Sequence, residues 1–161
     1  MPGPTRGIAT RRRSAALLFV LLLSGLLSVV VAGVGQALAG EATGFRIIAH
    51  PESSAGSLSR QFVADAFLKK AVRWPNGDTI RAVDLRLDAP ARQQFSEDVL
   101  RRSVSAVRSY WQQRIFSGRG VPPPELDSDA AVIRHVQSRR GALGYVSERA
   151  ETGGVQIVTL H

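Results

Sequence analysis

Residues 141–146 read Gly-Ala-Leu-Gly-Tyr-Val, a short apolar run that predicts a strand over 142–146. A second strand is expected at 155–160, beyond the turn signal at 152–154. A third, Gly-Phe-Arg-Ile-Ile-Ala, occupies 44–49 and ends at His50-Pro51. Strands this apolar need other elements to cover them, so we expect a mostly buried sheet.

Between the strand at 44–49 and the strand at 142–146, the sequence predicts one more strand and four helices. Trp74-Pro75-Asn76-Gly77-Asp78 is a turn signal, and the alternating run at 79–85 predicts a strand after it. Helices are predicted at 59–69, at 90–101 with Pro90 in the first turn, from Ser103 to Gly118, and after Ser128. Their inward stripes are Phe62, Val63, Ala66 and Phe67; Ala91, Phe95 and Val99; Val104, Val107, Trp111 and Ile115; Val132, Ile133 and Val136. The order predicts an α/β domain with helices layered on a mixed sheet.

The first 39 residues predict an export signal. Arg11-Arg12-Arg13 precede an apolar run at 15–34, and Ala37-Leu38-Ala39 matches the small-residue pattern of a cleavage site. We therefore expect a signal peptide at 1–39, a domain at 40–161 and a periplasmic location. The alternative is an uncleaved helix that anchors the domain to the inner membrane, facing the periplasm, because twenty apolar residues are long enough to span a bilayer.

Removing the signal changes the interpretation of the charge. The chain carries 21 basic and 13 acidic residues, and the first 39 hold four arginines and no acid. Residues 40–161 therefore have 17 basic and 13 acidic residues, which predicts a mildly basic surface without a nucleic-acid partner. The chain has no cysteine, which excludes disulfides, thiolate catalysis and cysteine-ligated zinc.

Signals for enzymatic chemistry are poor. No nucleophile elbow, no zinc-protease motif and no phosphate-binding loop of the ATPase type occurs. His161 is terminal, His135 lies on a predicted helix and His50 ends a strand. Asp127 and Asp129 flank a helix start, where they favour the helix dipole. We expect no enzyme activity, no metal and no cofactor.

Anion binding has better candidates. Ser53, Ser54 and Ser57 surround Gly56 just before a helix, where hydroxyls and free backbone N–H groups can hold an oxyanion. Arg86 and Arg92 flank the start of the second helix, and guanidinium groups bind phosphate or carboxylate through paired hydrogen bonds. The alternative is that these serines cap helices and these arginines are solvated.

Several segments together resemble one family. They are Leu58-Ser59 to Leu68, Trp74-Pro75-Asn76-Gly77, Arg92-x-x-Phe95 with Val99-Leu100, Trp111 to Gly118, Pro122-Pro123 and Gly141 to Val146. In this order they resemble the phosphate-binding-protein-like domain of ABC-transporter substrate-binding proteins, over residues 45–160. The resemblance implies a periplasmic-binding-protein type II fold and capture of phosphate or a similar oxyanion for a membrane permease.

The chain departs from that family in two respects. Phosphate-binding members commonly carry Ser-Gly-Thr before the helix arginine, where this chain has Ala89-Pro90-Ala91 before Arg92. The 122 residues after the signal also suit a single lobe, so closure on a ligand would need a partner protein or a dimer. Two hypotheses follow: a solute-binding component, or an accessory interaction domain that keeps the fold without the ligand.

Overall fold

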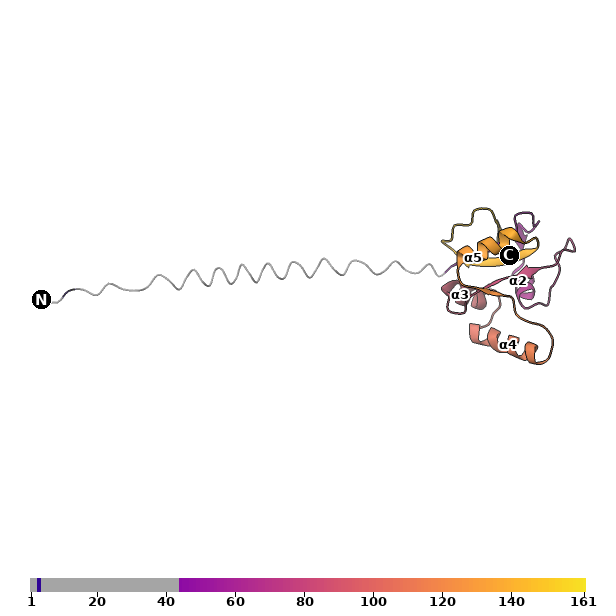
Figure 1. The fold of residues 1–161 in the computed structure, drawn as a ribbon, viewed down its shortest axis with the longest axis horizontal. Coiled ribbons are helices and arrows are strands. Elements are labelled where there is room, and N and C mark those ends of the chain that lie inside the picture. The colour runs from indigo at the N-terminus through magenta and orange to yellow at the C-terminus, as the bar shows by residue number, and fades with distance from the viewer. Residues whose placement is uncertain (1–2, 4–43) are drawn as a thin grey trace. The chain divides into compact units, whose positions relative to one another are not determined.

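The computed structural model describes residue 3 and residues 44–161, so the expected signal or anchor lies outside the described residues. The helices are α2 (Arg60–Phe67), α3 (Pro90–Asp98), α4 (Val104–Phe116) and α5 (Asp129–Ser138) (Figure 1). The strands are β1 (Phe45–Ala49), β2 (Ser57–Leu58), β3 (Arg81–Ala82), β4 (Asp84–Leu85), β5 (Glu125–Leu126), β6 (Ala142–Ser147) and β7 (Gln156–Leu160). Within the described range, no helix has the length and apolar character needed to cross a membrane.

The main sheet is mixed, as predicted, and has the strand order β2-β7-β1-β6-β3. Its centre, β1, pairs antiparallel with β6 and with β7, whereas β3 runs parallel to β6 and β2 runs parallel to β7. The apolar run at 142–146 therefore forms a strand in the middle of the molecule. A separate two-stranded parallel sheet joins β4 to β5.

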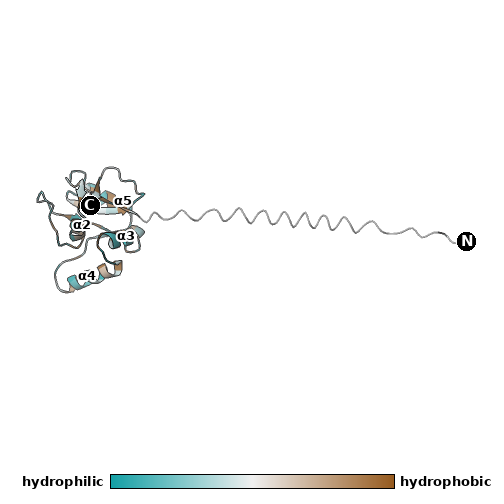
Figure 2. Cartoon of the chain, turned by 180° about the vertical axis from the view of Figure 1, so that it is seen from behind, coloured by the Kyte–Doolittle hydropathy of each residue, from teal (hydrophilic) through white to brown (hydrophobic). Residues whose placement is uncertain are grey.

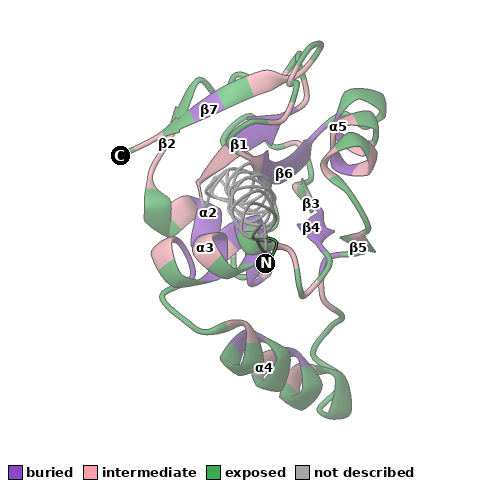
Figure 3. Ribbon diagram, turned by 90° about the vertical axis from the view of Figure 1, so that its left-hand side faces the viewer, coloured by how far each residue is buried: buried purple, intermediate pink, exposed green. Residues whose placement is uncertain are grey.

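Two neighbouring residues of β6 define the layers on either side of the sheet. Successive side chains of a strand point to opposite faces. The Gly144 position faces Val132 and Val136 of α5. The ring of Tyr145 stacks on Phe95 of α3, with ring centroids 4.0 Å apart, and lies 5.7 Å from the ring of Phe67 of α2. The sheet is thus covered by α5 on one face and by α2 and α3 on the other, which gives a three-layer α/β domain (Figure 3).

The helix starts follow the capping residues predicted from the sequence. Ser59, Ser103 and Ser128 each accept a hydrogen bond from the backbone N–H of the third residue of α2, α4 and α5. Pro90 occupies the first turn of α3 after Ala89. These four starts confirm the prediction.

Other expectations were wrong. The single strand expected at 79–85 is split into β3 and β4, because the chain changes from β6 to β5 as its partner at Val83. Ser57–Leu58, for which no strand was predicted, pairs with β7, and the strand β5 was not predicted either. Such two-residue strands have no alternation that a sequence could display.

Helix α4 lies apart from the sheet, and its only substantial helix or strand neighbour is α3 (Figure 3). Val107 and Trp111 are buried, as expected of its inward stripe. Ile115, expected on the same stripe, is 49% exposed. Ile115 lines an open hollow with Leu87 and Pro122, so its side chain is only partly covered.

Candidate functional site

The three predicted serines lie in the segment between β1 and α2, and their hydroxyls already have partners or face solvent. Ser53 Oγ is hydrogen-bonded to the side-chain amide of Gln156, at 3.0 Å. Ser57 Oγ lies 2.9 Å from Nδ1 of His161. Ser54 is exposed beside a small hollow. The serine loop is thus tied to β7 and to the residue that follows it.

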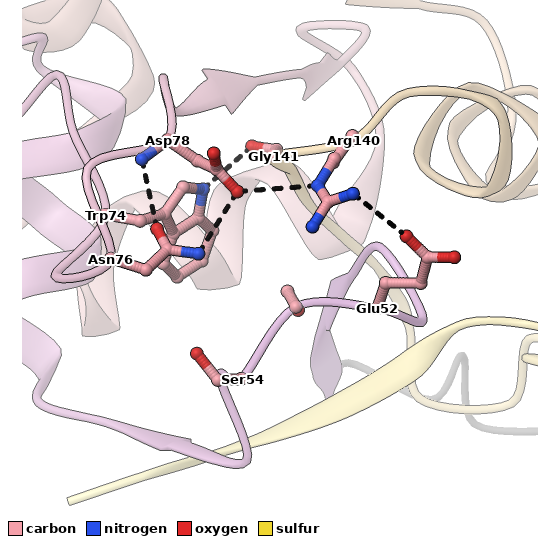
Figure 4. A pocket seen from close by; sticks show the side chains of 8 residues that line it. Glu52, Ser54, Trp74, Asn76, Asp78, Arg140 and Gly141 are labelled. Atoms are coloured by element: carbon pink, nitrogen blue, oxygen red, sulfur yellow. Dashed lines mark hydrogen bonds and ion pairs between the residues drawn. The ribbon is translucent and has the colours of Figure 1, made fainter.

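The hollow beside Ser54 is lined by polar side chains that bond to one another (Figure 4). Arg140 lies between Glu52, at 3.4 Å, and Asp78, at 3.6 Å, and Trp74 Nε1 donates to the carbonyl of Gly141. Its volume is about 10 Å³. That is room for roughly one water molecule, so in this form the hollow does not accommodate a tetrahedral anion.

Arg92 lies in the core and not at a surface. It is 3% exposed and pairs with the carboxylate of Asp84, while its Nη1 donates to the carbonyl of Leu85 at 3.0 Å. The hydroxyl of Tyr145 donates to the same carboxylate. A second, longer ion pair joins Arg92 Nη2 to Glu125 of β5 at 3.9 Å, and the Nε of Arg92 has no partner. The cluster therefore joins α3, β4, β5 and β6 around one arginine.

Burial dominates the titration of this cluster. It raises the pKa of Asp84 to about 6, against the opposing influence of the Arg92 cation, the Tyr145 hydroxyl and the Leu85 N–H. Burial, together with the nearby Asp84 charge, also raises the pKa of Tyr145 well above its ordinary value, so this phenol stays protonated. The three groups therefore form a structural cluster in which Tyr145 donates to Asp84, and Asp84 is the member that titrates.

A larger groove lies where α3 and α5 begin. Its volume is about 520 Å³, and it is lined by Leu85, Arg86, Ala89, Pro90, Ala91, Asp127, Ser128, Asp129, Ser147 and Arg149. Two helix N-termini therefore open onto one groove with two arginines at its wall. Helix N-termini carry partial positive charge, which with Arg86 and Arg149 favours a small anion. Asp127 and Asp129 on the same wall oppose it.

Some hydrogen-bond donors at the groove are free to bind an anion, and others are already bonded within the protein. Pro90 has no N–H, and the N–H of Arg92 is bonded to the carbonyl of Ala89, which leaves the N–H of Ala91 in the first turn of α3. The carboxylate of Asp129 accepts from the N–H and the hydroxyl of Ser147. Arg86 is exposed and pairs with Asp88 at 2.8 Å, an exchangeable surface contact.

Of the five predicted residues, the structure brings only Arg86 to this groove. Ser53 and Ser54 line the small hollow, Ser57 lies beside the C-terminal residue, and Arg92 is buried. Sequence reasoning missed Arg149 and Ser147. The signal available for them was their place at the end of the 142–146 strand, because strand ends in open α/β sheets are common ligand sites.

The three histidines supply no catalytic arrangement in the described residues. His50 Nδ1 accepts from the N–H of Glu52 at 3.2 Å. Burial and the neighbouring Arg139 lower the pKa of His135. Across residue 3 and residues 44–161, no group of three or more histidine and carboxylate side chains could hold a metal ion.

Comparison with known proteins places the fold. No family model matches the chain, and no curated protein matches it. The chain does match solved structures. One is a proposed phosphate ABC-transporter substrate-binding protein of Clostridium perfringens, solved with phosphate bound, which is 20% identical to this chain with a TM-score of 0.57. An ABC-type phosphate transport receptor from Vibrio cholerae is 14% identical, also at 0.57.

The chain has the fold of these phosphate receptors and spans less than half of their length. The matches cover 73% of this chain but 44% of the Clostridium protein and 46% of the Vibrio protein. The resemblance and the fold class inferred from the sequence are therefore confirmed, in a short, single-lobe form. At these identities the likeness is one of fold.

Proposed function

We propose that the protein is an exported solute-binding domain that holds a small oxyanion, with phosphate the leading candidate, in the groove where α3 and α5 begin. The observation that carries the proposal is the meeting of two helix N-termini with Arg86 and Arg149 around one groove. Partial positive charge from the helices and full charge from the guanidiniums favour an anion there. The phosphate receptors that share the fold support the same ligand class.

The open groove implies weak binding. Pro90 removes one backbone donor, no Ser or Thr side chain stands in the first turn of α3, and Asp127 and Asp129 bring negative charge to the wall. An open groove also leaves the ion in contact with water, where each charge pair is worth less. We infer millimolar affinity for the protein alone, and delivery to an ABC permease would require a partner protein or a second copy that covers the groove.

Export is part of the same proposal. We infer that residues 1–39 direct the chain out of the cytoplasm and are removed, leaving 40–161 in the periplasm. Sequencing the N-terminus of protein recovered from the periplasm would test this. A chain starting at residue 40 supports cleavage, and a membrane-bound chain with an intact N-terminus would support the anchor.

The second candidate, an interaction domain without a ligand, is favoured by one observation. The positions where phosphate-binding relatives commonly carry Ser-Gly-Thr hold Ala89-Pro90-Ala91, which supply no hydroxyl. The N–H of Ala89 is bonded to the carbonyl of Arg86, so Ala91 supplies the one free backbone donor of the three. Calorimetric titration of the purified protein with phosphate and sulfate separates the two candidates.

Each arginine of the groove can be tested with a matched control. Arg149→Gln and Arg86→Gln should each weaken phosphate binding about tenfold, because each removes one charge-assisted contact. Arg134 is an exposed residue of α5 outside the groove, so Arg134→Gln should leave the affinity for phosphate within twofold of the unchanged protein. If titration to 20 mM phosphate produces no heat of binding, the interaction domain is favoured. If all three variants lose affinity equally, the loss reflects only the general effect of net charge.

A further inference from the structure

Helix α4 and its flanks hold a large share of the positive charge of the described domain. We call residues 101–121 the α4 arm. The arm contains five arginines and no acidic residue: Arg101, Arg102, Arg108, Arg114 and Arg119. The rest of residues 40–161 has 12 basic and 13 acidic residues. The net positive charge of the domain is therefore located on this one element, which is set apart from the sheet (Figure 3).

The far end of the same arm exposes apolar side chains. Phe116 is 90% exposed, Val121 is 60% exposed and Ile115 is 49% exposed. Of the five large apolar residues exposed in the described part of the chain, these three fall within seven positions. Strongly polar and strongly apolar residues thus share one short helix and the turn after it (Figure 2). Such a concentration of apolar surface beside a basic patch marks an interaction site.

The arm is held in shape by its own contacts. The guanidinium of Arg114 lies over the rings of Tyr110 and Trp111, and Arg114 Nη2 donates to the carbonyl of Arg119 at 2.8 Å. Tyr110 in turn donates to the carbonyl of Leu68, which ties the arm to the end of α2. Arg108 and Arg119 remain exposed. These contacts order the arm locally, and the exposed Phe116 and the exposed Arg108 and Arg119 belong to the same arm.

We propose that the α4 arm docks on the surface of a bilayer rich in anionic phospholipid. Arginines attract the phosphate headgroups, and an exposed aromatic side chain gains from entering the boundary between headgroups and acyl chains. The apolar end is a single protruding phenylalanine at a helix terminus, which a soft bilayer can receive without a preformed groove.

Hydrogen exchange of the full-length protein on vesicles tests the proposal, because it reports on the arm separately from the N-terminal segment. Peptides covering residues 111–121 should be protected by vesicles containing phosphatidylglycerol and unprotected by pure phosphatidylcholine. Phe116→Ser should reduce that protection about tenfold, since it removes the inserted ring. Arg108→Gln combined with Arg119→Gln should reduce that protection about twenty-five-fold, at about fivefold for each charge.

Matched controls keep the result specific. Val72→Ser changes another apolar residue that is 53% exposed, and Arg60→Gln with Arg134→Gln removes two exposed arginines outside the arm. Both controls should keep the protection within twofold. The proposal is overturned if the arm stays unprotected on anionic vesicles, if neutral vesicles protect it equally, or if the controls lose as much as the arm variants. Phosphate binding in the groove is expected to be unchanged in the arm variants, so the two proposals fail independently.

Discussion

Asp84 is a buried carboxyl whose protonation is linked to folding. Its pKa is raised from 3.8 to about 6 in the folded protein, mainly because burial disfavours the charged form. A folded state that binds a proton more tightly than the unfolded state gains stability as pH falls. The contribution of Asp84 is therefore fully present below pH 3.8 and is lost as pH rises through 6.

We predict that this residue makes the folded domain more stable at pH 4.5 than at pH 7. Because the pKa rises from 3.8 to about 6, the free energy of unfolding can fall by about 3 kcal/mol at most between low pH and neutral pH. Asp84→Asn should abolish that part of the pH dependence. It should also lower stability at pH 7 by about 3–5 kcal/mol, because the buried Arg92 then keeps only the half-exposed Glu125, 3.9 Å away, as a counter-charge. Urea unfolding of both proteins between pH 4 and 8 measures this, and identical pH profiles would contradict it.

Arg86 and Arg92 illustrate how far single residues could be predicted. Both were candidates because both are arginines beside a helix start, and the sequence treats them alike. The folded chain separates them, since α3 buries the face that carries Ala91, Arg92, Phe95 and Ser96. Arg92 finds its counter-charge on β4, eight residues earlier, and its phenol neighbour on β6, more than fifty residues later. Such a non-local arrangement leaves no pattern in spacing.

At the scale of elements, β6 and α5 meet at Gly144 without room for a side chain. A Cβ atom at this position would lie 2.9 Å from Val132 Cγ1, 3.0 Å from Val83 Cγ1 and 3.2 Å from Val136 Cγ2. All three valines are fully buried, so none can turn outward. Gly144, the second glycine of the Gly-Ala-Leu-Gly-Tyr-Val run, therefore sets how closely α5 packs on the sheet.

Gly144→Ala is predicted to lower the free energy of unfolding by about 1–3 kcal/mol through overpacking. Combining it with Val132→Ala should cost less than the sum of the two single changes, because the new methyl group occupies space that the valine vacates. Gly153→Ala is the matched control, since no atom lies within 4 Å of its Cβ position. Thermal and urea unfolding of the four variants gives the coupling energy, and strict additivity would exclude a direct clash.

Elements differ in how well the sequence predicted them. The long strands β1, β6 and β7 and the four helices have enough apolar periodicity to be located within a few residues. Strands β2, β4 and β5 are two residues long and exist because a neighbouring strand offers free backbone groups. The candidate groove depends on where those short segments place the starts of α3 and α5. It was therefore beyond prediction, although both helix starts were predicted.

For the whole molecule, the unequal packing of the helices predicts unequal local stability. Helix α5 contacts β1, β4, β5 and β6, whereas the only comparable neighbour of α4 is α3. Both helices begin with a serine cap, so their starts are matched. Because opening a helix costs less when less of its surface is packed, α4 should open without unfolding the sheet.

Native-state hydrogen exchange without lipid should therefore show amides of α4 exchanging at least tenfold faster than amides of α5 and β6. Protection in β1 and β6 should approach the free energy of global unfolding measured with urea. Protection in α4 equal to that in α5 would contradict the prediction and would mean that Val107 and Trp111 hold the arm as firmly as the sheet holds α5. A lower value would give the arm the freedom to adjust to a surface while the groove at α3 and α5 keeps its shape, so that the two proposed sites would work on separate parts of one small lobe.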